Sequence, residues 1–284
     1  MSEAPFDQAA WLDRIGYDGP RAPTLAVLRG VIAAQSGTIP FENLDVLLGR
    51  VPRLDGASLQ RKLVDEKRGG YCFEINALLR MGLVSLGFTV TRLLARVIIG
   101  LDAAVARPAT HMALRVDLPE GPFLADTGFG NLTPTAPLAI VPDLAQATPH
   151  ETMRLATEGT ELVLQVDLGS EWRNLYRLAP EPKLDADYEV ANWFTATHPA
   201  SPFVAHLVAS RPMPDGGRYT LFNGRLSLRR RGLPVERAML ADDPAWAEAL
   251  ATHFGLRVTD ADLTAALAAL DRHGNRGMAH PSFD

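Results

Sequence analysis

The pattern of apolar residues changes near residue 89, and this change most constrains how the chain can fold. Before it, apolar residues recur at helical spacing, which predicts helices over 23–34 and 73–86 and a short amphipathic piece over 59–67. After it, short runs of β-branched and apolar residues predict strands over 89–99, 112–117, 122–126, 161–168 and 172–178.

The last third of the chain mixes the two patterns. It predicts strands over 218–222 and 225–230, and helices over about 186–196, 244–254 and 260–271. Prolines at 134, 137, 142 and 149 predict that residues 131–150 are largely a surface connection. Periodicity alone therefore predicts an α+β fold.

The composition is that of an ordinary globular chain. Its 284 residues are 47% hydrophobic and 21% charged, enough for one large domain or two or three small ones. The formal net charge is −5. The one basic cluster, Arg225 with residues 229–231, lacks interleaved aromatic residues and is typical of a solvated strand or turn. We therefore expect no nucleic-acid partner.

Cysteine and histidine usage limits the redox and metal chemistry. The single cysteine, Cys72, excludes an intrachain disulfide and fits a reducing compartment. The seven histidines show no metal-binding spacing, so we expect no metal. The N-terminus lacks a basic stretch before an apolar core, and no apolar run approaches roughly eighteen residues. These features predict a cytoplasmic protein that does not engage a membrane.

The segment around Cys72 has the features of an activated thiol. Cys72 follows two glycines in residues 68–74 (RGGYCFE) and precedes the predicted helix over 73–86. The thiolate is the reactive form of cysteine, and a helix N-terminus stabilises negative charge. The glycines permit a tight chain entry and the close approach of another group. The alternative is a small buried apolar residue, which is what most free cysteines are.

Two further residues could complete a catalytic site. His111 stands at the start of the strand predicted over 112–117, and Asp126 ends the strand predicted over 122–126. A thiol, an imidazole and a carboxylate supply a nucleophile, a proton acceptor and a group that orients the imidazole. Each partner also has a structural interpretation, since an Asp before Thr-Gly is usually a turn former.

Six segments together resemble the arylamine N-acetyltransferase family. Residues 68–74, 108–111 (PATH) and 126–130 (DTGFG) resemble the family's three catalytic segments. Residues 39–45 (IPFENLD), 192–203 (NWFTATHPASPF) and 219–225 (YTLFNGR) resemble its other signatures. The resemblance runs from about Ala9 to near Leu256, in the family's order and spacing.

The resemblance implies a fold, a reaction and a catalytic set. The implied fold is an N-terminal helical bundle (1–88), a central antiparallel β-barrel (89–185) and a C-terminal α/β lid (186–284), with a papain-like Cys-His-Asp core. The implied reaction is ping-pong: acetyl-CoA acylates the cysteine, and an aromatic amine or hydrazine then takes the acetyl group. By matching position, Cys72 is the nucleophile, His111 its base and Asp126 the residue that holds the imidazole.

The resemblance also implies binding residues. Phe41, Phe129 and Phe203 match aromatic positions that line the acceptor pocket, although core packing would explain Phe41 equally well. The Gly128-Phe129-Gly130 turn matches the segment that approaches the coenzyme A pyrophosphate, where glycines allow close backbone contact. The remaining implied coenzyme contacts are Thr197, His198 and Ser201.

The chain departs from the family pattern at positions outside the triad. Thr127 stands where the family usually has an aliphatic residue, and Gln35 where many relatives have histidine or leucine. Ser36 and Gly37 weaken the end of the predicted helix there. Pro202 replaces a residue that is commonly polar or basic. These departures bear on substrate preference and cofactor affinity rather than on the chemistry.

Two alternatives remain open from the sequence. One is another cysteine acyltransferase on the same scaffold, such as a macrolactam-forming amide synthase, which uses a carrier-bound acyl chain. The other is a non-catalytic binder of aromatic amines or coenzyme A, with Cys72 inert. The natural acceptor, the preferred acyl chain, the amides that stabilise an oxyanion and the oligomeric state are not predicted.

Overall fold

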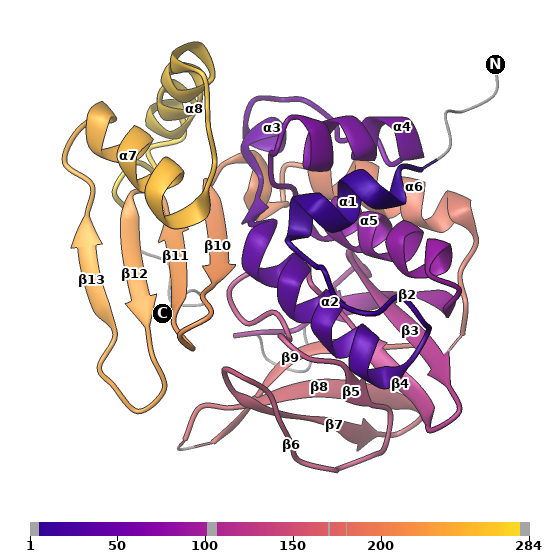
Figure 1. The fold of residues 1–284 in the computed structure, drawn as a ribbon. Helices are drawn as coiled ribbons and strands as arrows, with labels where there is room; N and C mark the ends of the chain where they lie inside the picture. The colour runs from indigo at the N-terminus through magenta and orange to yellow at the C-terminus, as the bar shows by residue number, and fades with distance from the viewer. Residues whose placement is uncertain (1–5, 101–106, 170, 180, 279–284) are drawn as a thin grey trace.

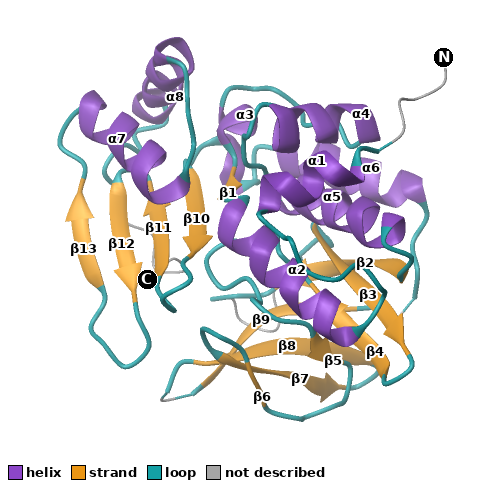
Figure 2. Cartoon of the chain, viewed as in Figure 1, coloured by secondary structure: helices purple, strands orange, loops and turns teal. Residues whose placement is uncertain are grey.

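The computed structural model describes residues 6–100, 107–169, 171–179 and 181–278. The predicted helical bundle (1–88) and lid (186–284) include residues 1–5 and 279–284, which lie outside the described residues. Two antiparallel sheets and a group of N-terminal helices make up the fold (Figures 1 and 2), which confirms the predicted α+β class.

The N-terminal part is helical. Its elements are α1 (Gln8–Ile15), α2 (Leu25–Thr38), α3 (Leu44–Leu47), α4 (Gly56–Leu59), a π-helical turn η1 (Gln60–Asp65) and α5 (Cys72–Ser85). The side chains of Asp7 and Thr24 cap α1 and α2 by accepting backbone N–H groups. Although Gly37 was expected to weaken its end, α2 continues to Thr38. Residues on its buried face, including Val31 and Ile32, anchor it in the main core.

The central part is an eight-stranded, nearly closed antiparallel barrel. The strand order is β5-β4-β3-β2-β9-β8-β7-β6. The strands are β2 (Thr89–Val97), β3 (His111–Leu118), β4 (Gly121–Ala125), β5 (Leu138–Ala139), β6 (Gln146–Ala147), β7 (Thr152–Glu158), β8 (Glu161–Asp167) and β9 (Trp172–Leu178). Apolar side chains from most of these strands, such as Leu93, Leu155 and Leu164, fill a core of their own.

Residues 131–150 are less superficial than the prolines predicted. They supply β5 and β6 at the two ends of the sheet, and several of their side chains are buried. Buried threonines are tolerated there because their hydroxyls are hydrogen-bonded: Thr135 Oγ1 lies 3.0 Å from His150 Nδ1, and Thr148 Oγ1 donates to Glu151 O at 2.7 Å.

The C-terminal part is a second sheet with helices on one face (Figure 1). The chain reaches it through α6 (Asp185–Thr197) and a 3₁₀ turn η2 (Pro202–Val204), whose apolar side chains belong to the main core beside the N-terminal helices. The sheet and its covering helices are β10 (Val208–Pro212), β11 (Arg218–Phe222), β12 (Arg225–Arg229), β13 (Glu236–Met239), α7 (Asp243–Phe254) and α8 (Asp260–Arg272). A two-residue strand from the N-terminal part, β1 (Phe41–Glu42), pairs with β10 and completes the sheet. Trp246, Leu250 and Leu267 pack α7 and α8 onto it.

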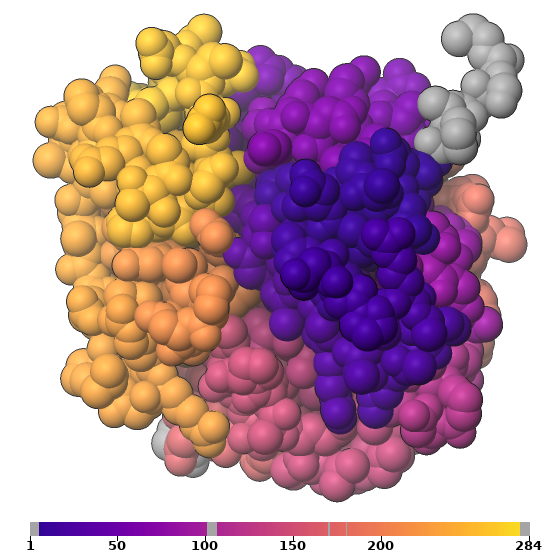
Figure 3. Space-filling model, viewed as in Figure 1, coloured from indigo at the N-terminus to yellow at the C-terminus, as the bar shows by residue number. Residues whose placement is uncertain are grey.

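The three parts lie against one another on the face shown in Figure 3. The main core surrounds α5, which packs against β2 and β3 of the barrel. This packing brings the first residue of α5, Cys72, beside the first residue of β3, His111. Among the described residues, no helix is both long enough and apolar enough to span a membrane.

Candidate active site

Cys72 is the first residue of α5, so the helix begins one residue earlier than the predicted range of 73–86. Its thiol lies 3.7 Å from the carbonyl oxygen of Thr110, the residue before His111. The preceding glycines are needed for close chain packing, because a Cβ on Gly69 would lie 2.4 Å from Pro40 O. The tight entry therefore places the thiol at the positive end of a 14-residue helix.

His111 connects the thiol to a buried carboxylate. Its Nε2 lies 2.7 Å from Asp126 Oδ2, and both side chains are almost fully buried. Cys72 is within hydrogen-bonding reach of the same imidazole. Because Nε2 is engaged by Asp126, Nδ1 is the nitrogen available to the thiol. Sulfur, imidazole and carboxylate thus stand in the order that nucleophilic catalysis requires.

The electrostatics of the pair favour a charged imidazole. Burial lowers the pKa of His111, but the Asp126 charge and the hydrogen bonds to Asp126 and Cys72 outweigh burial and raise it. Burial raises the pKa of Asp126, but His111 and hydrogen bonds from Asn76 and the Gly128 N–H hold it below its usual range. The result is an ion pair, with Asp126 ionised and His111 protonated.

Asp126 is held by four donors. Oδ1 accepts from Asn76 Nδ2 at 2.8 Å and from the Gly128 N–H at 2.9 Å. Oδ2 accepts from the Tyr176 hydroxyl at 2.9 Å, in addition to His111. A carboxylate satisfied on both oxygens in a buried site has a fixed orientation, and it fixes that of the imidazole.

An apolar cavity of about 790 Å³ opens beside Cys72 and His111. Phe41, Phe129 and Phe203 line it, and so do Gly128, Gly130 and Ser201. Their roles in binding the acceptor or the coenzyme stay predictions. Among the described residues that line it, none is acidic. The cavity therefore offers flat apolar surface directly at the thiol.

Two of the other three predicted coenzyme contacts lie outside the lining of the cavity. Thr197 and His198 are not among the described residues that line the cavity. The Thr197 hydroxyl donates to Trp193 O within α6, and His198 stacks on Phe194 at a ring distance of 4.2 Å. Ser201 lines the cavity, but its hydroxyl donates to Thr195 O at 2.6 Å. A coenzyme role for these three residues stays a prediction.

The turn after Asp126 touches the start of α5. A Cβ on Gly128 would lie 3.0 Å from Cys72 Cα and 2.9 Å from Asn76 Nδ2. Only glycine allows this approach without displacing a neighbour. The turn is thus in direct contact with the residue that carries the thiol.

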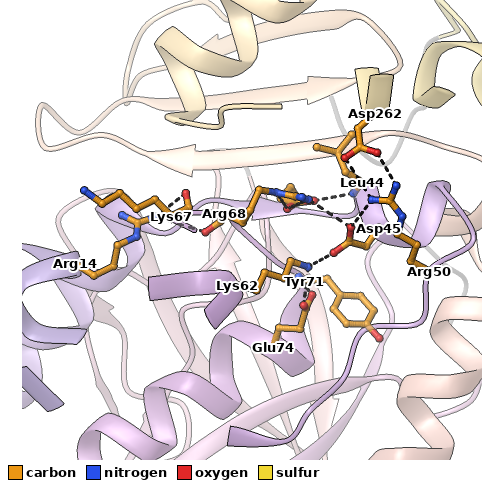
Figure 4. Close-up of polar contacts among 11 residues, drawn as sticks. Arg14, Leu44, Asp45, Arg50, Lys62, Lys67, Arg68, Tyr71, Glu74 and Asp262 are labelled. Atoms are coloured by element: carbon orange, nitrogen blue, oxygen red, sulfur yellow. Dashed lines mark hydrogen bonds and ion pairs between the residues drawn. The ribbon is translucent and has the colours of Figure 1, made fainter. Parts of the chain in front are cut away.

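A chain of charged groups lies beneath the start of α5 (Figure 4). Ion pairs link Glu42, Arg68, Asp45, Lys62 and Glu74 in that order, at 2.8, 3.7, 2.6 and 2.7 Å. The Glu74 carboxylate accepts the Tyr71 N–H at 3.1 Å and so fixes the residue before Cys72. Burial lowers the pKa of Lys62, but the surrounding carboxylates outweigh it and raise the pKa.

This charged chain reaches the C-terminal part of the molecule. Arg50 contacts Asp262 in the first turn of α8 at 2.5 Å and Asp45 at 3.6 Å (Figure 4). A second cavity, of about 420 Å³, opens beside these groups. The charged residues that line this cavity largely pair with one another. They are therefore part of the ion-pair network that supports α5.

Sequence reasoning missed two groups that hold the triad. Asn76 had a detectable signal, since it stands four residues after Cys72 and so on the same face of the helix. Tyr176 had none, because nothing in its strand pattern marks the residue that reaches a carboxylate 50 positions away. Within the described part of the chain, no group of three or more His, Cys, Asp or Glu residues could hold a metal ion.

Known proteins resemble this chain over nearly its whole length. A family model described as N-acetyltransferase matches residues 24–263. The arylamine N-acetyltransferase of Escherichia coli (strain K12) is 40% identical over 93% of this chain and 96% of its own. The arylamine N-acetyltransferase of Mycobacterium bovis is 42% identical over 90% of this chain and 91% of its own. The structure of Mycobacterium marinum arylamine N-acetyltransferase in complex with CoA superposes with a TM-score of 0.88, at 40% identity over 94% of this chain and 99% of that one. Sequence, fold and site thus agree, and the chain belongs to the arylamine N-acetyltransferase family.

Proposed function

We propose that this protein transfers the acetyl group of acetyl-CoA to the nitrogen of an aromatic amine or arylhydrazine through an acetyl thioester on Cys72. The observation that carries the proposal is the side-by-side placement of Cys72, His111 and Asp126 at an apolar cavity. A relative of the same fold has been solved with CoA, which supports this donor.

In the first half-reaction, the Cys72 thiolate attacks the carbonyl carbon of acetyl-CoA. The bond between that carbon and the coenzyme sulfur breaks, and the protonated His111 gives its proton to the leaving thiolate. The N–H groups of the first turn of α5 carry partial positive charge next to Cys72. They would stabilise the tetrahedral oxyanion, an effect typically worth about 3 kcal/mol per donor.

In the second half-reaction, the amine nitrogen attacks the acetyl carbon on Cys72. His111, now neutral, accepts the proton from nitrogen, and the carbon–sulfur bond breaks to release the amide. The cycle ends with the thiolate and imidazolium restored. Asp126 keeps the imidazole oriented in both halves and stabilises it when it is protonated.

The cavity supplies the selectivity for an aromatic acceptor. The Phe41 and Phe203 rings lie 5.8 Å apart, and the Phe129 ring packs edge-on against His111 at 5.2 Å. An aromatic amine would stack among these rings, and an apolar site protects the thioester from water. Gly128 and Gly130 would let the backbone approach the coenzyme pyrophosphate. Ser201, Thr197 and His198 would contribute further coenzyme contacts.

A free thiol is essential to this mechanism, so we place the protein in a reducing compartment, the cytoplasm. No nucleic acid or metal takes part in the proposed cycle.

Steady-state kinetics with acetyl-CoA and an aromatic amine or hydrazine test the proposal. We expect acetylated amine by mass spectrometry and parallel double-reciprocal lines, because the two substrates react in separate steps. Intersecting lines would contradict the covalent intermediate. No product with acetyl-CoA, but product with a carrier-bound acyl chain, would favour an amide synthase. No turnover and a Cys72 that resists iodoacetamide at pH 6 would favour a non-catalytic binder.

A further inference from the structure

Two polar side chains outside the triad, Gln35 and Thr127, meet in the interior. Gln35, on α2, donates from Nε2 to the hydroxyl oxygen of Thr127 at 2.9 Å, across 92 residues of sequence. Both side chains are buried, at 0% and 3% exposure. Neither side chain lines the described part of the cavity. Because Thr127 is the first residue of the turn that follows Asp126, this hydrogen bond attaches that turn to α2.

Gln35 is itself firmly anchored. Its Oε1 accepts the indole N–H of Trp11 at 2.9 Å, and its Nε2 also donates to Ile75 O at 3.2 Å. Trp11 is fully buried and lies against Gly82 of α5, where a Cβ would come within 2.4 Å of the indole. Gln35 on α2 therefore forms hydrogen bonds with both α1, through Trp11, and α5, through Ile75.

Thr127 links Gln35 to the groups that hold the Asp126 carboxylate. Its backbone N–H donates to Asn76 Oδ1 at 3.0 Å. This contact orients the Asn76 amide so that Nδ2 faces Asp126 Oδ1, at 2.8 Å. The Thr127 hydroxyl thus binds the turn to Gln35. The Thr127 backbone N–H orients Asn76, which in turn donates to the Asp126 carboxylate.

We infer that Gln35 and Thr127 are positioning residues for the transferase reaction, and that their hydrogen bond fixes the turn that holds Asp126 against His111. The inference rests on the proposed function. It assigns the pair no contact with either substrate, because both act through Asp126 and its turn. Loss of their bond should slow the chemical step and leave substrate binding unchanged.

Single-turnover acylation by acetyl-CoA, followed by intact-protein mass, tests the inference in wild type, Thr127→Val, Thr127→Ser, Gln35→Leu and the double variant Gln35→Leu/Thr127→Val. We expect Thr127→Val and Gln35→Leu each to slow acylation about tenfold, the scale of a small misplacement at a reacting centre. The KM for acetyl-CoA should stay within about twofold. Thr127→Ser keeps the hydroxyl and should acylate at close to the wild-type rate.

The double variant decides whether the two residues act through one contact. If they do, it should lose little more than the slower single variant, since both changes remove the same hydrogen bond. Additive losses, an unchanged rate in Thr127→Val, or an equal loss in Thr127→Ser would overturn the inference. Should Thr127→Val not fold, Thr127→Ala carries the same expectation. A wild type that takes no acetyl group would refute the proposed function instead, whatever the variants do.

Discussion

Two buried polar assemblies flank α5, and they are built from different chemistry. Around Asp126, the supporting groups are neutral: amides and hydroxyls of Asn76, Gln35, Thr127 and Tyr176. Beneath the start of the helix, the support is ionic, and its central cation, Lys62, is 14% exposed. Both assemblies reach the backbone next to Cys72.

The difference reflects what each assembly must hold. The Asp126 carboxylate must remain ionised and aimed at His111, and neutral donors orient it without adding a competing charge. The network around Lys62 instead joins segments far apart in sequence. Its charge-assisted hydrogen bonds, such as those from two guanidinium nitrogens of Arg68 to Glu42 Oε1, suit that task. The neutral assembly should therefore control rate, whereas the ionic one should control stability.

The largest expected effect is on rate, at the carboxylate that the neutral assembly holds. Asp126→Asn should slow acylation by about 10³- to 10⁴-fold. The amide carries no charge to stabilise the imidazolium, and it does not hold the neutral imidazole of His111 in the tautomer that the reaction needs. Rapid-quench acylation with acetyl-CoA measures the rate, and circular dichroism verifies the fold. A rate within tenfold of wild type would remove Asp126 from the catalytic set.

The ionic assembly should instead lose stability. Lys62→Met removes the ammonium group that pairs with the Glu74 carboxylate, whose side chain is 3% exposed. It leaves Asp45 with only its longer contacts to Arg50 and Arg68. Removing one partner of a buried pair typically costs about 3–5 kcal/mol of unfolding free energy. Urea denaturation measures this loss. The double variant Lys62→Met/Glu74→Gln is the matched control and should recover part of it. A loss below about 1 kcal/mol would mean that the network behaves like a surface ion pair.

The His111–Asp126 pair should make stability depend on pH. The folded pKa of His111, raised to about 10, exceeds an unfolded value of about 6.5. Its contribution is therefore complete below about pH 6.5 and is lost as pH rises toward 10. The Tm advantage of wild type over His111→Gln/Asp126→Asn, which lacks both groups, should shrink across that window. An advantage that stays constant or grows with pH would contradict the ion pair.

The smallest effect is expected at the outer end of the ionic assembly. The Arg50 side chain is 53% exposed, so its contact with Asp262 is screened by water. Asp262→Asn should lower the unfolding free energy by at most about 1 kcal/mol and leave acylation unchanged. Urea denaturation at low and high salt measures it. A loss as large as that of Lys62→Met would show that the network acts as one unit through to α8.

The sequence predicted the parts of the site that depend on local chain geometry. Cys72 at the start of a helix, His111 at the start of a strand and Asp126 directly after one each carry a signal within a few residues. The strand β1 had no such signal, because two residues cannot show a period and its partner β10 lies about 170 positions away. Tyr176 and the contact between Gln35 and Thr127 depend on how the elements pack, which periodicity does not encode.

Other predictions depended on side-chain surroundings that no pattern displays. Prolines predicted a surface connection over 131–150, but hydrogen-bonded threonines such as Thr135 allow part of it to be buried. Ser201 lines the cavity whereas Thr197, four residues earlier, bonds back within α6. The boundaries of the three predicted parts stay a prediction, and β1 joins the first part to the sheet of the third.

The central claim is that Cys72 carries the acetyl group. The most direct measurement is the intact mass of the protein after mixing with acetyl-CoA without an amine, beside the Cys72→Ala variant. We expect one acetyl adduct on wild type, none on the variant, and loss of the adduct when an aromatic amine or hydrazine is added. An equal adduct on the folded Cys72→Ala variant, or an adduct that an amine does not discharge, would contradict the mechanism.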